Sequence, residues 1–314
     1  MRRVALLCSI AFVAVLSVSA QNTKKEKPAT AWKTGGMFSL IGGQSGSRNW
    51  APTGSEKLTF ATAVNLNLWA AKKWGRNTWD NTADLSYGLL YTRSEKSRKT
   101  NDKIDLYSHF NHSLVGLAGL GTIANLRSQF TNGYDYTENP RKRISGFFAP
   151  AYLTFAPVVF SVKSKDNSLT FSATPAAARW VIVTNSPYSL NYQGGVKPDG
   201  SQERTLAELY GVDPGKKVDF QVGPYVSALF KKEIVKNVMW KTRLDINMDF
   251  NQTHLRETDV YWTNTIGMTV NKWLKVNYTF DLYQDADVNM FGPNKDASRT
   301  QMLSLLGVGL GVSF

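Results

Sequence analysis

Residues 300–314, TQMLSLLGVGLGVSF, decide the fold of this chain. From Leu306 onward, apolar residues alternate strictly with glycine and serine. Because successive side chains of a strand point to opposite faces, one face is wholly apolar and the other is nearly bare. Such a strand could lie against the core of a soluble barrel. An ending on Phe314 is instead typical of an outer-membrane β-barrel, so we interpret Phe314 as a C-terminal insertion signal for the barrel-assembly machinery.

The chain begins with the pattern of a secretory signal peptide, which we place at residues 1–20. Arg2 and Arg3 precede an apolar run that is too short to span a membrane, and small residues follow it. Residues 21–31 are polar and predict a disordered periplasmic lead-in, followed by a barrel over residues 32–314. Cys8 is the only cysteine, so the mature chain has no disulfides and no thiol chemistry.

The chain is basic, with a formal net charge of +13. One interpretation is that these basic residues only form a solvated surface. The other is that they attract outer-membrane lipid and lipopolysaccharide, whose headgroups are anionic. For an exported chain we expect no nucleic-acid partner.

Long segments with a period of two residues follow the lead-in. Residues 58–70, 79–92 and 238–251 alternate apolar and polar side chains over lengths well beyond the usual strand of about five or six residues. Residues 144–162 contain Pro150 and Pro157 and should be bent, and residues 169–183 should be broken at Pro175. The whole pattern predicts an all-β fold, an antiparallel transmembrane β-barrel of about 12 strands.

The predicted connections alternate in length, as short periplasmic turns and longer extracellular loops do in such barrels. The short ones lie near residue 75 and at 115–119, 163–167, 231–236 and 271–272, and the longer ones at 46–55, 93–100, 132–142, 185–216, 252–257 and 285–299. An even strand number places both termini in the periplasm.

The longest loop, residues 185–216, carries a possible short helix from Ser201 to Tyr210, ended by Gly211. It is either a surface loop ordered by this helix or a lid over the barrel mouth.

Aromatic side chains gather near the predicted strand ends, as two interfacial girdles require. We place Trp69, Trp74, Trp79, Trp240, Trp273 and Phe314 near the periplasmic ends, and Tyr91, Tyr134, Tyr136 and Tyr283 near the outer ends.

The inward-facing positions carry charges of both signs, and these are the candidate site residues. Spacing alone leaves open whether they fill the lumen as ion pairs or line a narrow hydrophilic pore. The lumen-facing candidates are Asp80, Asp84, Asp105, Arg127, Lys241, Arg243, Asp245 and Asp249.

Catalysis is not expected. His112 and Ser113 are adjacent, so on a strand they face opposite sides and cannot form a hydrogen-bonded catalytic pair. His109 and His112 likewise face opposite sides and form no metal pair. We expect no cofactor and no metal.

Several motifs spread along the mature chain resemble an uncharacterised family of outer-membrane β-barrel proteins of the Bacteroidota, a domain of unknown function. They are Trp32 with Gly35, Gln44, Asn49-Trp50, Trp79-Asp80-Asn81, Tyr87-Gly88, residues 98–102, Gln129-Phe130-Thr131 with Gly133-Tyr134, residues 211–217, residues 231–238 and the ending at 307–310. The likeness fades over residues 175–205. The resemblance implies an outer-membrane location and a barrel fold, and it brings no catalytic residues.

Two functions therefore stay open. One is a narrow channel or transport barrel for small solutes. The other is a non-conducting structural or accessory barrel that docks periplasmic or export-system partners through residues near Trp32 and basic turns such as Lys231-Lys232.

Overall fold

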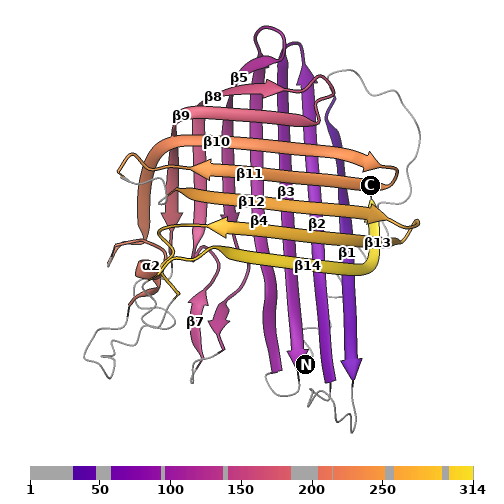
Figure 1. The fold of residues 1–314 in the computed structure, drawn as a ribbon, viewed down its shortest axis with the longest axis vertical. Coiled ribbons are helices and arrows are strands. Elements are labelled where there is room, and N and C mark those ends of the chain that lie inside the picture. Colours follow the sequence, from indigo (N-terminus) through magenta and orange to yellow (C-terminus); the bar gives the residue numbers. More distant parts are fainter. Residues whose placement is uncertain are drawn as a thin grey trace. The chain divides into compact units, whose positions relative to one another are not determined.

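Twelve long strands pair antiparallel and close into a barrel in the computed structural model, which confirms the predicted fold class (Figure 1). The structure describes residues 31–46, 58–92, 96–136, 141–184, 204–213, 215–251, 258–291 and 297–313. The barrel strands are β1 (Lys33–Gly46), β2 (Leu58–Trp74), β3 (Asn77–Thr92), β4 (Lys96–Ser113), β5 (Ala118–Ser128), β8 (Ala151–Lys163), β9 (Leu169–Ile182), β10 (Val218–Val235), β11 (Val238–Asn247), β12 (Asp259–Thr269), β13 (Leu274–Gln284) and β14 (Gln301–Ser313).

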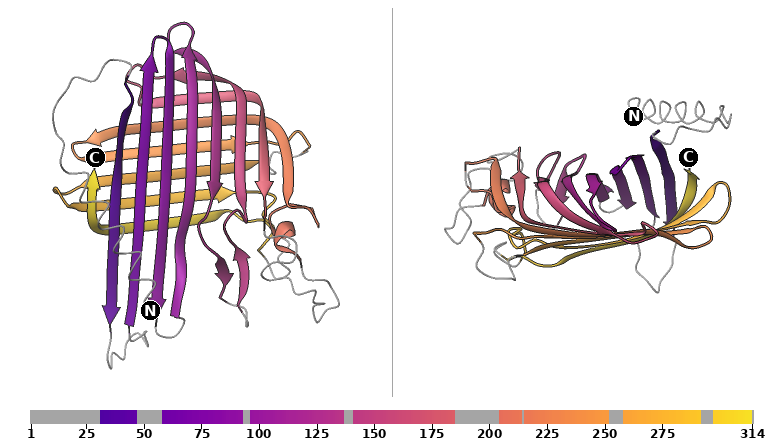
Figure 2. Two further views of the ribbon diagram at one scale, coloured as in Figure 1. Left: turned by 180° about the vertical axis from the view of Figure 1, so that it is seen from behind. Right: turned by 90° about the horizontal axis from the view of Figure 1, so that it is seen from above.

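The two walls of the barrel cross each other steeply. In Figure 1 strands β1–β4 run from top to bottom, and strands β10–β14 run across them on the other wall. Figure 2 shows the same crossing from behind. Strands of transmembrane barrels tilt by roughly 35–45° from the barrel axis, so opposite walls cross at about twice that angle. Side chains from the two walls therefore meet inside the barrel.

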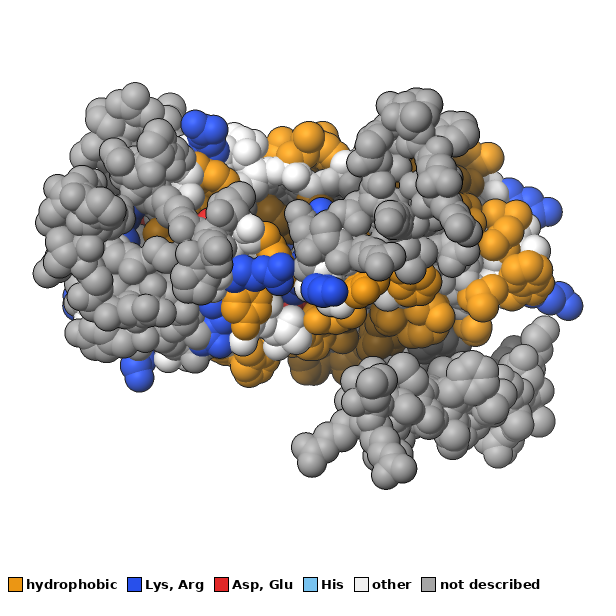
Figure 3. Space-filling model, turned by 90° about the horizontal axis from the view of Figure 1, so that it is seen from below, with side chains coloured by type: hydrophobic (Ala, Val, Ile, Leu, Met, Phe, Trp, Pro, Cys, Tyr) orange, Lys and Arg blue, Asp and Glu red, His pale blue; other side chains and the backbone are white. Residues whose placement is uncertain are grey.

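The outer face is apolar and the inner face is polar. On β14, Leu306 is 71% exposed, whereas Asp245 on the inner face of β11 is 1% exposed. Hydrophobic side chains occupy much of the coloured surface in Figure 3. This arrangement inverts that of a soluble protein and is the one that a lipid-embedded barrel requires. Among the described residues, no helix is long and apolar enough to cross a membrane.

The barrel closes where β14 meets β1. Five residue pairs form this seam, from Met37 opposite Ser313 to Ile41 opposite Gly309. The seam begins just beyond Gly35-Gly36, and these two glycines pair with β2. At Gly309 an added Cβ atom would collide with the backbone oxygen of Leu40, so this position needs a residue without a side chain.

Replacing Gly309 with valine should prevent closure of the barrel. The clash is with backbone, which cannot move aside as the end of a flexible side chain can. We expect the folded fraction to fall several-fold, measured by the heat-dependent shift of folded barrels in gel electrophoresis. Gly42→Ala is the matched control, because an added Cβ atom there meets nothing within 4 Å. Equal folding of the two variants would contradict this view of the seam.

Two predicted strand features differ in the structure, and a third is confirmed. β3 and β4 pair as far as Thr92 and Lys96, so the predicted loop 93–100 shrinks to residues 93–95. β9 is a single strand across Pro175 rather than a broken one, but its pairing with β10 shifts register there, where Pro175 and Ala176 lie opposite Pro224. The predicted irregularity at Pro157 is confirmed, since β5 shifts register against β8 there. Proline donates no hydrogen bond to a ladder, and both shifts are located where one interrupts it.

A small apolar cluster covers part of the barrel mouth at the long-loop end. Its centre is α2 (Leu206–Leu209), whose cap is Thr205 and not Ser201, which lies outside the described residues. Thr205 and Glu208 form a capping box, and the helix ends before Gly211, as predicted. The cluster comprises Ala149, Val181, Val183, Leu206, Ala207, Leu209, Tyr210, Val212 and Val288. Beside it, β6 (Gly133–Asp135) and β7 (Lys142–Ser145) form a separate two-stranded sheet.

Candidate functional site: the polar lumen

A charged cluster crosses the centre of the lumen. A terminal nitrogen of the Arg243 guanidinium on β11 lies 2.5 Å from the carboxylate of Asp105 on β4. The Nε of Arg243 lies 3.0 Å from the carboxylate of Asp245, but the geometry does not make a hydrogen bond, so this contact is an ion pair. Arg127 of β5 pairs with Asp245 and lies 3.6 Å from Asp105. Two arginines therefore alternate with two carboxylates between opposite walls.

Neutral groups complete this central cluster. Tyr225 and Ser227 each donate a hydrogen bond to Asp245 at 2.8 Å, and Asn125 donates to Asp105 at 2.8 Å. Beneath it lies an apolar cluster of Tyr107, Ile123, Ala156, Val159, Ala177 and Tyr225. This half of the lumen, beside β5, β8, β9 and β10, is packed like a protein core.

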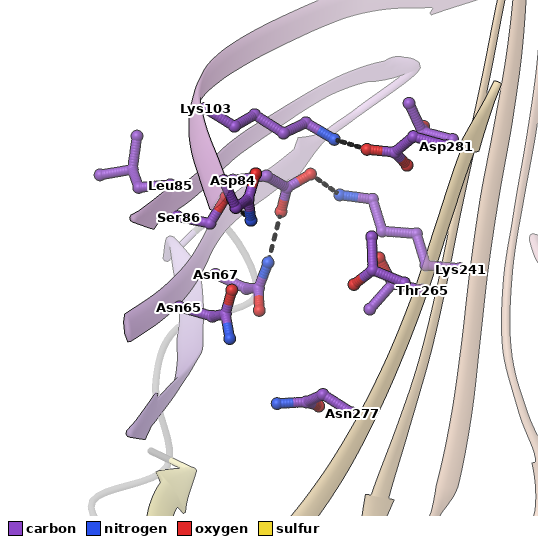
Figure 4. Close-up of a pocket in the computed structure, with 13 residues that line it drawn as sticks. Asn65, Asn67, Asp84, Leu85, Ser86, Lys103, Lys241, Thr265, Asn277 and Asp281 are labelled. Atoms are coloured by element: carbon purple, nitrogen blue, oxygen red, sulfur yellow. Dashed lines mark hydrogen bonds and ion pairs between the residues drawn. The ribbon is translucent and has the colours of Figure 1, made fainter. Parts of the chain in front are cut away.

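The other half of the lumen is polar and keeps a small cavity. Lys241 donates to Asp84 at 2.6 Å, and Lys103 donates to Asp281 at 2.9 Å, so two ion pairs join the walls across the cavity (Figure 4). The cavity measures about 40 Å³. A single water needs roughly 10–15 Å³ by the same measure, so the cavity holds water but no sizeable solute. Asn65, Asn67, Ser86, Asn101, Thr263, Thr265, Asn277 and Thr279 also line it.

A larger pocket opens above this cavity at the long-loop end. It measures about 400 Å³ and has a mixed lining that includes Tyr152, Tyr210 and Tyr283. Three residues line both spaces, namely Asn101, Lys103 and Asp281. The Lys103–Asp281 ion pair therefore separates the outer pocket from the lumen cavity.

The side chain of Trp69 points into the lumen at the short-turn end of the barrel. We predicted that Trp69 belongs to the lipid-facing girdle near the periplasmic ends, but its ring packs inward over Gly35, and the ammonium of Lys231 of β10 lies 5.1 Å from the ring centre. Tyr283 also faces inward, since its hydroxyl donates to Asp281 at 3.2 Å. Trp69 and Tyr283 both occupy positions of the two-residue alternation that face inward, so the sequence itself indicates their orientation. The prediction of the two girdles did not take this alternation into account.

The structure places the remaining candidates at different depths. Asp80 lies near the short turns, where Lys163 donates to it at 3.2 Å. Asp249 lies beyond the end of β11, which stops at Asn247 and not at residue 251. Its carboxylate accepts a hydrogen bond from the backbone of Asn251, two residues away. Phe314 lies outside the described residues, as do residues 1–30, which contain the expected signal peptide.

A second charged cluster lies nearer the barrel mouth, and its residues were not predicted from the sequence. Arg179 of β9 binds Asp259 and Asp285, and it donates to Tyr261 at 2.7 Å. Arg179 was hidden because Pro175 obscured the alternation of its strand. Asp259 and Asp285 escaped notice because they stand at strand ends, where alternation stops.

Three carboxylates of this region have oxygens within 4.8 Å of one another, those of Asp259, Asp285 and Asp287. Arg179 supplies the counter-charge that a metal ion would otherwise supply, so we assign no metal here. Burial and the neighbouring Asp285 raise the pKa of the Asp287 carboxyl, which lies outside the strands.

One histidine has a serine partner inside the barrel. His109 Nε2 lies 3.2 Å from the hydroxyl of Ser161, which also contacts Ser172 at 2.9 Å. Sequence spacing could not reveal this pair, because 52 residues separate its members. His109 is 3% exposed and Ser161 is 2% exposed, so this conformation offers a substrate no access. His112 contacts Asn77 at 2.8 Å, and His254 lies outside the described residues.

Comparison with known proteins finds one family model that matches part of the chain and several distant structural likenesses. Residues 43–134 match a family model described as "Protein of unknown function (DUF3078)", which agrees with the expected resemblance to an uncharacterised domain. No curated protein matches. The origin in Bacteroidota stays a prediction.

Among solved structures, the chain is similar to the translocator domain of the autotransporter NalP from Neisseria meningitidis. The identity is 11%, the coverage is 99% of this chain and 97% of that one, and the TM-score is 0.39. An outer membrane channel from Pseudomonas putida F1 shows 9% identity, coverage of 94% and 99%, and a TM-score of 0.38. The NanC porin shows 10% identity, coverage of 87% and 98%, and a TM-score of 0.35. Likenesses this distant carry no argument, so the barrel assignment rests on the strand pairing described above.

Proposed function

We propose that this chain is an integral outer-membrane β-barrel with a narrow polar path for small hydrophilic solutes, which ion pairs hold closed. In this proposal residues 1–20 are a cleaved export signal, and Phe314 is read by the barrel-assembly machinery. The apolar outer face and the polar interior support membrane insertion. No catalytic role is proposed for any residue.

One observation carries the proposed path. The outer pocket and the lumen cavity meet at a shared ion pair, Lys103 with Asp281, and a second pair, Lys241 with Asp84, spans the cavity beyond it. Lysine side chains are flexible, and each makes its contact through a single ammonium group. Swinging them aside requires no change of the barrel wall. A lining of amide and hydroxyl groups then suits a hydrated ion or a small polar solute better than an apolar one.

The second candidate is a non-conducting accessory barrel. The observation that favours it is the central cluster of Arg127, Arg243, Asp105 and Asp245, which fills the other half of the lumen. In that case the docking surface for a periplasmic partner would lie at the short-turn end, where Lys231 and Lys232 are exposed.

Single-channel recording of the purified protein in planar bilayers separates these functions. We expect a closed baseline with infrequent, brief steps, because only water fits the resting cavity. A steady, large conductance would contradict a closed lumen. Complete silence together with a co-purifying periplasmic protein would support the accessory barrel.

A further inference from the structure

A groove lies on the outer face of the barrel at the short-turn end. Its space measures about 560 Å³. Large aromatic rings surround smaller residues of neighbouring strands. The ring centres of Trp32 and Trp79 lie 5.4 Å apart, and those of Trp74 and Phe110 lie 6.0 Å apart. The remaining lining residues are Lys72, Ser108, Thr122 and Ala124.

The polar groups in the floor of this groove are already satisfied. The indole of Trp79 donates to the hydroxyl of Ser108 at 2.8 Å, and that hydroxyl donates to Asn81 at 2.8 Å. The hydroxyl of Thr122 donates to the backbone oxygen of Pro157 at 2.9 Å. A floor without free donors accepts hydrocarbon at little cost, although polar side chains form it.

Among the residues that the structure describes, Lys72 is the only charged one in the lining. Its ammonium lies 5.8 Å from the ring centre of Trp32 and 5.5 Å from that of Trp74, so the two rings hold it at the rim by cation–π contacts. No carboxylate in the described part of the chain pairs with it. The groove therefore combines an apolar floor with one positive charge at its edge.

We propose that this groove binds one anionic phospholipid of the leaflet at the short-turn end. An acyl chain lies along Ser108, Thr122 and Ala124, and the phosphate meets Lys72. The tryptophan rim places the groove at the depth of the headgroups, where amphipathic rings gather in barrels. The adjoining outer face is apolar, for example at Leu106, so a lipid is the neighbour that this surface meets. The inference rests on the proposed membrane location and not on conduction.

Native mass spectrometry of the folded barrel tests this site, with phosphatidylglycerol and phosphatidylcholine as probes. We expect the wild type to retain phosphatidylglycerol preferentially. Lys72→Met, which keeps an apolar stem without the charge, should lower that retention about fivefold and leave phosphatidylcholine unchanged, since one basic residue near an anionic lipid contributes about that factor. Ala124→Trp, which fills the floor, should abolish retention of both lipids. Lys272→Met is the matched control, because Lys272 lies in a turn at the same end, outside the groove.

Two results would overturn the proposal. One is a Lys72→Met variant that retains lipid like the Lys272→Met control. The other is displacement of the retained lipid by soluble glycerol 3-phosphate, which would identify a site for free phosphate. Heat-dependent gel migration verifies that each variant is a folded barrel, and bilayer recording of the same preparations reports separately on the proposed channel.

Discussion

Replacing Arg243 with methionine should lower the free energy of unfolding by about 3–5 kcal/mol, the usual cost of removing one partner from a buried ion pair. Arg243 is 2% exposed and contacts both carboxylates of the central cluster. Without it, Asp105 and Asp245 share only Arg127. Methionine fills much of the vacated volume, so the loss reports mainly on charge. Urea unfolding in detergent micelles, followed by tryptophan fluorescence, measures it.

A matched control uses an ion pair that water surrounds. Lys216 donates to Asp213 at 2.8 Å, and both side chains are 67% exposed. Lys216→Met should change stability by less than about 1 kcal/mol, because exposed pairs contribute little. Adding Asp105→Asn to Arg243→Met should recover part of the loss by removing one of the stranded charges. If Arg243→Met behaves like the control, the central cluster does not hold the two walls together.

The fold was predictable from the sequence because barrel strands are long and amphipathic. Strict alternation, as in β2 and β14, fixes which side chains face outward, and a two-residue period leaves little freedom of register against lipid. The same two-residue alternation correctly identified the inner face of β4, where Asp105, Tyr107, His109 and Asn111 are all buried.

The contacts across the lumen were not predictable in the same way. Alternation gives the face of a side chain but neither its depth nor its partner on the opposite wall. Arg127 and Asp245 are 118 residues apart, and Arg243 and Asp105 are 138 residues apart. Such pairs follow from strand tilt and barrel closure, which no local pattern encodes.

Alternation also gives little information at the end of a strand. Asp249 keeps the alternation of β11, between the exposed Met248 and Phe250, but it lies beyond the end of the strand at Asn247. Conversely, the polar residues of 96–101 look like a loop, yet their backbone continues the β4 ladder. Lys99 helps to hold that extension, because it donates to Asp102 at 2.9 Å and to Gln129 at 2.8 Å.

The most direct test of a closed polar path is to remove the contacts that close it. Asp84, Lys103, Lys241 and Asp281 are changed together to serine, so both ion pairs disappear and neither leaves a stranded charge. Trp69→Ala is added, since this ring narrows the short-turn end. The control is the pair Asp166→Ser and Lys232→Ser, which removes an exposed ion pair outside the lumen.

Single-channel conductance in planar bilayers is the measurement. We predict sustained open steps for the five-residue variant, with a mean conductance at least about tenfold above that of the wild type, because a water-filled opening replaces side chains that join the walls. The Asp166→Ser/Lys232→Ser control should stay closed like the wild type. A five-residue variant that folds into a heat-modifiable barrel but conducts no more than the wild type would contradict the proposed path.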